Sequence, residues 1–183
     1  PYTVIYNAPN ESVFNSRYEK EENNKIRLIA TSWSDNVKKG FKYYDFLDQN
    51  LDFDKYEFCF IGRSPIKFSN INMLGVLETK EIAEQLRSSD IFVTASENDP
   101  CSNSLIEALS SNLPAAVLNS GGHPELLGAG GVKFDSQKDL IESIDHLADN
   151  ISEYRSKIRV KTIKQIAGEY VSFFEYCLRE RQE

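Results

Sequence analysis

The sequence predicts an α/β fold in which a doubly wound, six-stranded parallel sheet of the Rossmann-like type is covered by helices on both faces. Short apolar runs alternate with segments of helical periodicity along most of the chain, as in sheets whose strands are joined by crossover helices. The run Glu57–Ile61 is almost continuously apolar, which is typical of a strand buried on both faces. With 183 residues, of which 40% are hydrophobic and 27% charged, the chain has the size and composition of one globular domain.

We predict strands at residues 26–30, 57–61, 71–75, 90–95, 115–118 and 132–134. Helices are expected at residues 41–51, 79–88, 104–111, 124–127 and 137–148, and the chain is expected to be helical throughout from residue 151 onward. Thr79 is the expected cap of one helix, and Asn103 or Ser104 of another. The expected strand order is 3-2-1-4-5-6, and ligands of such sheets bind at the carboxyl ends of the strands.

The formal net charge of −7 argues against nucleic acid or a polybasic membrane patch as the main partner. No apolar run is long enough for a transmembrane helix, and we expect no signal peptide. The three cysteines have no paired spacing, which indicates a reducing compartment. The first residue is proline, not methionine, and we expect the chain to be part of a longer protein.

The candidate site lies in the stretch from Ala95 to Leu127. A loop carries Asp99, the helix after it carries Glu107, and a Gly121-Gly122 turn follows the next strand. The free N–H groups and the dipole of a helix N-terminus attract anions, most often phosphate. Two carboxylates beside such a site suit a ligand with both hydroxyls and phosphates, and a nucleotide sugar is such a ligand. No HExxH or CxxC pair typical of a metal site and no GxGxxG or Walker loop occurs, so we expect no metal or cofactor.

The chain resembles the C-terminal, donor-binding half of retaining group-1 (family 4) glycosyltransferases with the GT-B fold. "VIYNAPNESVF" is similar to the family's interdomain segment, and "ATSWSDNVKKG" resembles its basic loop. "FCFIG" and "NMLGVL" fit the next two strands. "DIFVTASENDPCSNSLIEALSSNLP" resembles the Glu-x7-Glu signature, and "NSGGHPELL" the Gly-Gly-x-Pro-Glu turn. The order and spacing of these pieces carry the resemblance, which runs nearly from end to end.

The resemblance implies a role for each matching residue. Lys39 is expected to contact the diphosphate and Asp99 the hydroxyls of the transferred sugar, and these two are the expected catalytic residues. Glu107 is expected to hold the ribose hydroxyls. The other expected substrate contacts are Lys38, the backbone N–H groups of Asn103, Ser104 and Leu105 at the distal phosphate, and the backbone of Gly121 and Gly122.

The sequence departs from the family pattern at three positions. Asp99 stands where the family has glutamate, and Trp33 where it has arginine, with Lys38 as a substitute for that charge. The family's glycine before a proline is replaced in Asn112-Leu113-Pro114, so the helix is expected to end on an asparagine. Burial is the expected environment of Trp33, with stacking on a base or a sugar as the alternative.

The implied organisation has three parts. Residues 1–24 form an interdomain-type segment, residues 25–150 the nucleotide-sugar-binding domain, and residues 151–183 helices that pack back toward an N-terminal acceptor-binding domain. The expected activity is retaining transfer of a hexosyl group to a glycan or other acceptor, as in polysaccharide biosynthesis. The chain alone is expected to be inactive. The expected location is the cytoplasm. Peripheral attachment to the inner face of the membrane, through the N-terminal domain, is left open.

Several alternatives compete with these assignments. Ser104-Leu-Ile-Glu107 also fits a capping box, and Asp99 before Pro100 fits a turn. His123 is expected to be an ordinary surface residue. A GT-B-type sugar-nucleotide epimerase would need a histidine near the sugar, for which His123 is the candidate. A non-enzymatic flavodoxin-like module would need an acidic cluster after the first strand, where the chain has Ala-Thr-Ser-Trp.

Overall fold

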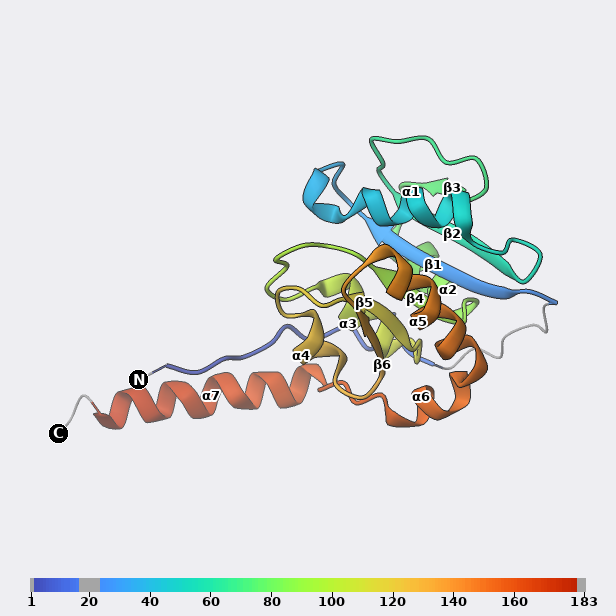
Figure 1. Cartoon of the computed structure of the whole chain (residues 1–183). Coiled ribbons are helices and arrows are strands. Elements are labelled where there is room, and N and C mark those ends of the chain that lie inside the picture. Colours follow the sequence, from blue (N-terminus) through green and yellow to red (C-terminus); the bar gives the residue numbers. More distant parts are fainter. Residues whose placement is uncertain (1, 17–23, 181–183) are drawn as a thin grey trace.

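Figure 1 shows a parallel sheet with helices on both faces in the computed structural model of the protein, which describes residues 2–16 and 24–180. The strands within this part of the chain are β1 (Ile26–Ser32), β2 (Tyr56–Gly62), β3 (Asn72–Gly75), β4 (Ile91–Thr94), β5 (Ala115–Leu118) and β6 (Gly131–Phe134). They pair in the order β3-β2-β1-β4-β5-β6, and all pairs are parallel. The predicted fold class and strand order are confirmed.

Two core clusters, one on each face, bury the sheet. Successive side chains of a strand point to opposite faces, so Leu28 and Ala30 lie in one cluster and Ile29 in the other. The first cluster includes residues of α1 (Phe41–Asn50) and α5 (Gln137–Asp149). The second includes residues of α2 (Thr79–Arg87), α3 (Asn103–Ser110) and α4 (His123–Leu127). Burial on both sides explains why the central strands are apolar at nearly every position.

Two predicted helix caps are wrong by one or two residues. Glu78, not Thr79, caps α2, and its backbone N–H donates to Glu81 Oε2 at 2.7 Å. Ser102, not Asn103 or Ser104, caps α3. Serine and asparagine are both good caps, and Ser102, Asn103 and Ser104 are consecutive. The tertiary structure therefore decides which of the three caps the helix. Ser102 is 3% exposed, which fixes it at the start of the helix.

The end of α3 confirms the expectation that an asparagine replaces the family's glycine. Asn112 has a φ of +63°, in the left-handed region that glycine and asparagine tolerate best. The N–H of Asn112 bonds to the carbonyl of Leu109, and that of Leu113 to the carbonyl of Ala108, at 2.9 and 3.0 Å. These are the two hydrogen bonds of a Schellman motif, which ends the helix and turns the chain toward β5.

The prediction that the chain is helical throughout from residue 151 is wrong, because residues 158–162 are not helical. α6 (Ile151–Lys157) ends where Ile158 packs against the second core cluster. α7 (Ile163–Glu180) begins with a new cap, in which Thr162 Oγ1 accepts from Gln165 N and Gln165 Oε1 accepts from Thr162 N. This reciprocal pair is a capping box, so the break is encoded locally.

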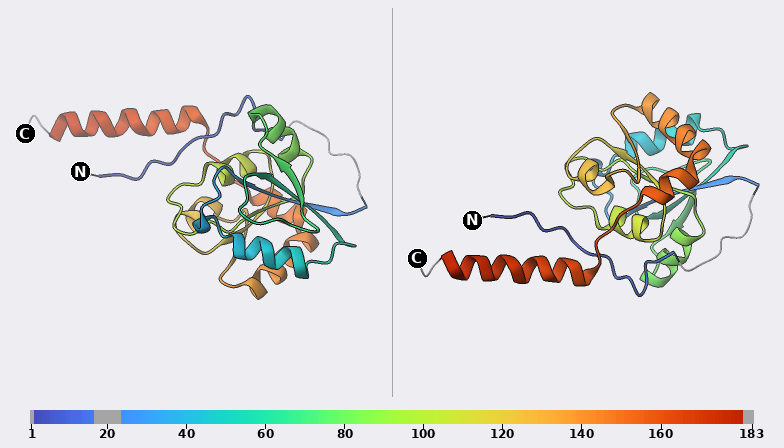
Figure 2. Two further views of the ribbon diagram at one scale, coloured as in Figure 1. Left: turned by 90° about the horizontal axis from the view of Figure 1, so that it is seen from above. Right: turned by 90° about the horizontal axis from the view of Figure 1, so that it is seen from below.

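The N-terminal segment runs across the domain and then beside α7. Residues 2–10 are extended and have no sheet partner among the described residues. Phe14 packs into the second core cluster, and Arg87 Nη1 donates to the carbonyl of Val13 at 2.8 Å. Figures 1 and 2 show α7 projecting away from the sheet, with the N-terminal segment alongside it. Residues 1 and 17–23 of the predicted segment 1–24, and residues 181–183 of the predicted C-terminal helices, lie outside the described residues.

The helices give no sign of a membrane span. Throughout residues 2–16 and 24–180, no helix is both long and apolar enough to cross a bilayer.

Candidate functional site

The candidate site is built from the loops that follow β1, β4 and β5, at the carboxyl edge of the sheet (Figure 1). The loop after β1 contains η1 (Val37–Lys39) and ends at Gly40, which has a φ of +78°. A Cβ at Gly40 would lie 2.0 Å from the carbonyl oxygen of Ala95, so only glycine allows this approach. Glu97 N donates to the carbonyl oxygen of Lys38 at 2.7 Å. The lysine loop is therefore held against the loop that follows β4.

This packing brings the two predicted catalytic residues together. Lys39 Nζ lies 3.5 Å from Asp99 Oδ2, and the side chains are 35% and 19% exposed. Asp99 Oδ1 also accepts from Cys101 N at 3.2 Å, which closes a turn. Asp99 thus stabilises a turn, as its alternative assignment predicted. It also pairs with Lys39, the residue predicted to contact a diphosphate.

The Gly121-Gly122 turn packs against the Asp99 loop. A Cβ at Gly121 would lie 2.4 Å from the carbonyl oxygen of Asp99, and one at Gly122 would lie 2.2 Å from that of Pro100. Gly122 N donates to the carbonyl oxygen of Asp99 at 2.8 Å. The two glycines are explained by contact between loops, and their predicted approach to the sugar phosphate stays a prediction.

The N-terminal turn of α3 offers fewer free donors than predicted. Ser102 Oγ accepts from Leu105 N at 3.4 Å, so the Leu105 N–H has a partner. The backbone N–H groups of Asn103 and Ser104 have no hydrogen-bond partner among the described residues. Of the three N–H groups expected at a distal phosphate, two are therefore available in this part of the chain.

Glu107 lies in the second turn of α3 and is partly buried. Its carboxylate makes no hydrogen bond or ion pair within residues 2–16 and 24–180. Burial without a partner disfavours the charged form and raises the pKa of Glu107 to about 7. The capping-box alternative is wrong, because the cap is Ser102 and the residue three positions later is Leu105. A partly buried carboxylate without a partner is typical of binding sites.

Lys38 and Trp33 extend the same loop into solvent. Lys38 is exposed, and its side chain makes no ion pair in the described part of the chain. Trp33 is 57% exposed, so the prediction that it is buried is wrong. The hydrogen bond from Ser32 Oγ to the carbonyl oxygen of Ser34, at 2.7 Å, turns the chain sharply at this point. This loop has no periodicity in its sequence from which the exposure could be deduced.

His123 is completely buried, contrary to its expected surface position. Its Nδ1 lies 3.3 Å from the carbonyl oxygen of Leu118, and its Nε2 has no partner among the described residues. Burial lowers the pKa of His123, while the Leu118 carbonyl and the charge of Asp99 act in the opposite direction. His123 and Leu127 are the buried residues of α4, and their separation of four positions is the signal that would have indicated burial.

Sequence reasoning missed two residues of the N-terminal segment that contact this region. Asn7 Nδ2 donates to Asn103 Oδ1 at 2.8 Å. Tyr6 lies beside Glu125 of α4, whose carboxylate raises the pKa of Tyr6. No local pattern reveals such contacts, because the residues of each pair are far apart in the sequence.

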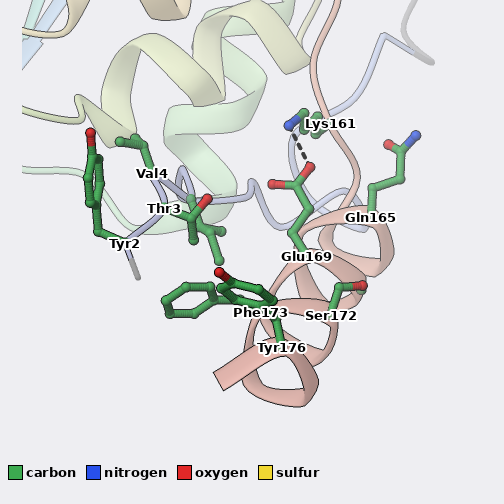
Figure 3. A pocket seen from close by; sticks show the side chains of 11 residues that line it. Tyr2, Thr3, Val4, Lys161, Gln165, Glu169, Ser172, Phe173 and Tyr176 are labelled. Atoms are coloured by element: carbon green, nitrogen blue, oxygen red, sulfur yellow. Dashed lines mark hydrogen bonds and ion pairs between the residues drawn. The ribbon is translucent and has the colours of Figure 1, made fainter. Parts of the chain in front are cut away.

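A pocket of about 900 Å³ lies outside this edge, between the N-terminal segment and α7 (Figure 3). It is lined on one side by Tyr2, Thr3 and Val4 and on the other by residues of α7, among them Phe173 and Tyr176. An ion pair at 2.5 Å between Lys161 and Glu169 lies beside it. None of the residues predicted to bind substrate lines this pocket.

Comparison with known families decides the class of the protein. The model of the family "Glycosyl transferases group 1" matches residues 67–165, which is more than half of the chain. The chain belongs to this family. Its fold is accordingly the Rossmann-like half of a GT-B glycosyltransferase. No curated protein matches the sequence.

Solved structures of glycosyltransferases share this fold at low identity. A glycosyltransferase from Rickettsia africae has a TM-score of 0.76 and 14% identity, over 96% of this chain and 57% of that one. The pneumococcal O-GlcNAc transferase, in complex with UDP and GlcNAc, has a TM-score of 0.67 and 14% identity, over 95% and 38%. The C-terminal domain of a group 1 family protein from Francisella tularensis has a TM-score of 0.60 and 20% identity, over 81% and 91%. The chain thus spans about half or less of the two longer proteins and most of the isolated domain.

Proposed function

We propose that the chain is the donor-binding domain of a retaining group-1 glycosyltransferase of family 4, and that it binds a nucleoside-diphosphate sugar. The observation that carries the proposal is the carboxylate of Glu107. It is partly buried, has no partner in the described chain, and lies in the helix whose N-terminus has free N–H groups. A ribose with two adjacent hydroxyls would supply the missing hydrogen bonds, and the diphosphate would meet the N–H groups.

The proposed chemistry is positioning and electrostatic stabilisation. Lys39 is paired with Asp99 in the structure. A diphosphate would compete with Asp99 for the lysine, and this would free the aspartate to accept from hydroxyls of the transferred sugar. Lys39 and the N–H groups of α3 would then stabilise the negative charge that develops on the leaving diphosphate. The expected overall reaction is transfer of a hexosyl group to a glycan or other acceptor, in the cytoplasm.

The proposed binding is independent of metal. The described residues contain no group of three or more His, Cys, Asp or Glu side chains that could hold an ion. An epimerase of the same fold would need a histidine at the sugar, and the full burial of His123 leaves that alternative without support.

The test is a calorimetric titration of the chain with UDP, GDP and ADP, first in EDTA and then with Mn²⁺. We expect at least one of the three to bind in EDTA with an affinity that Mn²⁺ changes little. If none binds under either condition, the proposed donor site is wrong. Binding that appears only with Mn²⁺ would keep the donor site and overturn its metal independence.

A further inference from the structure

The N-terminal segment contacts both helices that begin at the proposed donor site. Asn7 donates through its side chain to Asn103 Oδ1 at 2.8 Å and through its backbone N–H to Cys101 Sγ at 3.5 Å. These partners are 96 and 94 positions away in the sequence. Tyr6 and Glu125 of α4, which lies three residues after the Gly121-Gly122 turn, line the same small pocket. The segment therefore spans the first residue of α3 and the first turn of α4.

The segment is held firmly enough to present Asn7 at a fixed place. Pro9 is buried, and Phe14 is 4% exposed in the core cluster that also contains residues of α3. The carbonyl of Val13 accepts from Arg87 Nη1 at 2.8 Å. Pro9, Val13 and Phe14 thus fix the chain to the domain within seven residues of Asn7. Asn7 therefore contacts Asn103 from a segment that is held in place.

The hydrogen bond from Asn7 sets the orientation of the Asn103 amide. A side-chain amide carries an acceptor oxygen on one branch and a donor NH₂ on the other. Because Asn103 Oδ1 accepts from Asn7, the oxygen, which repels phosphate, is turned toward the N-terminal segment. The NH₂ branch is turned away from Asn7, and no described residue accepts from it. Asn103 is the first residue of α3, and its backbone N–H has no partner in residues 2–16 and 24–180 either.

We propose that Asn7 is a positioning residue of the donor site and that it acts through Asn103. It holds the carbonyl of the Asn103 amide away from the diphosphate and leaves the NH₂ group to donate to a phosphate oxygen. The proposal rests on the donor site proposed above. It assigns the N-terminal segment a part in donor binding, beside the interdomain role that the resemblance implies for it.

A double-mutant cycle tests this proposal with whichever of UDP, GDP and ADP binds the unaltered chain tightest. The variants are Asn7→Ala, Asn103→Ala and the two combined, each titrated by calorimetry and unfolded in urea. Asn10→Ala is the matched control, because Asn10 is an exposed asparagine of the same segment whose Oδ1 accepts, among the described residues, only from Ser12. Asn7→Asp is a second probe, since a carboxylate accepts but cannot donate to Asn103 Oδ1.

We expect Asn7→Ala to weaken binding about three- to tenfold, the effect of one hydrogen bond. Asn7→Asp should weaken it further, because the carboxylate attracts the Asn103 NH₂ group and adds negative charge near the diphosphate. The combined variant should bind no more weakly than Asn103→Ala alone, and Asn10→Ala should bind within about twofold of the unaltered chain.

Two results would overturn the role of Asn7 while leaving the donor site intact: nucleotide affinity unchanged in Asn7→Ala, or an equal loss with and without the Asn103 side chain. Should urea unfolding show that Asn7→Ala does not fold, Asn7→Asp decides, and an affinity equal to that of the unaltered chain would overturn the role as well. Absence of nucleotide binding by the unaltered chain would reject the proposed function, and this inference with it.

Discussion

At the scale of single residues, the buried carboxylate of Glu107 links the stability of the fold to pH. The carboxylate has no partner in the described chain, and its pKa is raised from 4.5 to about 7. Between these values the folded protein holds a proton that the unfolded chain has released, so stability falls as pH rises. Above about pH 7 the Glu107 carboxylate is charged in the folded protein, although burial removes part of its hydration. A ligand that supplies hydrogen bonds would compensate for this cost.

Replacing Glu107 with glutamine should therefore change stability and binding in opposite directions. At pH 8 we expect Glu107→Gln to raise the free energy of unfolding by about 1–3 kcal/mol, because no charge is desolvated, with solvent screening reducing the gain at this partly exposed site. At pH 5, where the folded glutamate is already neutral, the gain should be below about 1 kcal/mol. Nucleoside-diphosphate affinity at pH 8 should fall at least about a hundredfold, since two charge-assisted hydrogen bonds to the ribose are lost.

Urea unfolding at the two pH values and calorimetry at pH 8 measure both effects on the same variant. Glu84 in α2 serves as the matched control, because it is a helical glutamate that is exposed to solvent. Glu84→Gln should leave the pH dependence of unfolding and the nucleotide affinity unchanged. A loss of stability in Glu107→Gln at pH 8, with unchanged affinity, would return Glu107 to a structural role.

At the scale of elements, strands and helices follow from local patterns, whereas the site depends on contacts between distant loops. The apolar runs and their spacing were sufficient to predict the sheet and its order, because both faces of each central strand are buried. The resemblance to a family identified Gly121 and Gly122 as site residues. It did not reveal that a Cβ added at either position would collide with the Asp99 loop. The cap at Ser102 was missed because packing decides between neighbouring serine and asparagine candidates that are nearly equal. The break at Ile158 was missed although a local signal, the capping box of Thr162 and Gln165, marks the start of the next helix.

The Schellman motif at the end of α3 gives a prediction for one element. Asn112 has a φ of +63°, so a β-branched residue there should be strained by about 1–2 kcal/mol, while glycine should not. We expect Asn112→Val to lower the free energy of unfolding by more than about 1 kcal/mol and Asn112→Gly to leave it unchanged or raise it slightly.

Urea unfolding checks the order of the three proteins, and nucleotide titration provides the control. The motif lies at the opposite end of α3 from the proposed phosphate contacts, so neither variant should alter affinity by more than about twofold. An Asn112→Val protein as stable as the unaltered chain would show that the left-handed turn is not a constraint in solution.

At the scale of the whole molecule, the N-terminal segment and α7 project together from the sheet (Figure 2). Tyr170, Phe174 and Leu178 are spaced four residues apart along α7, and they are 44%, 59% and 61% exposed. Residues at this spacing share one face of a helix, and an exposed apolar face of this kind is typical of surfaces that bind another protein or domain, a membrane or a ligand. The match with the glycosyltransferase from Rickettsia africae covers 57% of that protein, so that protein contains further chain beyond the shared fold. We therefore propose that an N-terminal acceptor-binding domain docks on this face.

Matched charge substitutions on α7 distinguish a face that binds another domain from a face that is only exposed to solvent. In a two-domain protein, Phe174→Glu combined with Leu178→Glu should lower sugar transfer at least about tenfold, because two charges would be buried at the interface. Nucleotide affinity should be unchanged, since α7 contains none of the proposed donor contacts. Lys164→Glu is the control, because Lys164 is exposed on α7 and its replacement changes charge without interrupting the apolar face.

The same docking face predicts that the chain alone binds nucleotide but transfers no detectable sugar, and that transfer requires an attached N-terminal domain. The reason is that the donor and the acceptor must be held together for reaction, and the proposed site of this chain holds only the donor. Transfer is measured with a radiolabelled donor, and nucleotide binding by calorimetry. Sugar transfer by the chain alone, or full transfer by the double variant, would show that catalysis does not depend on a domain docked at α7.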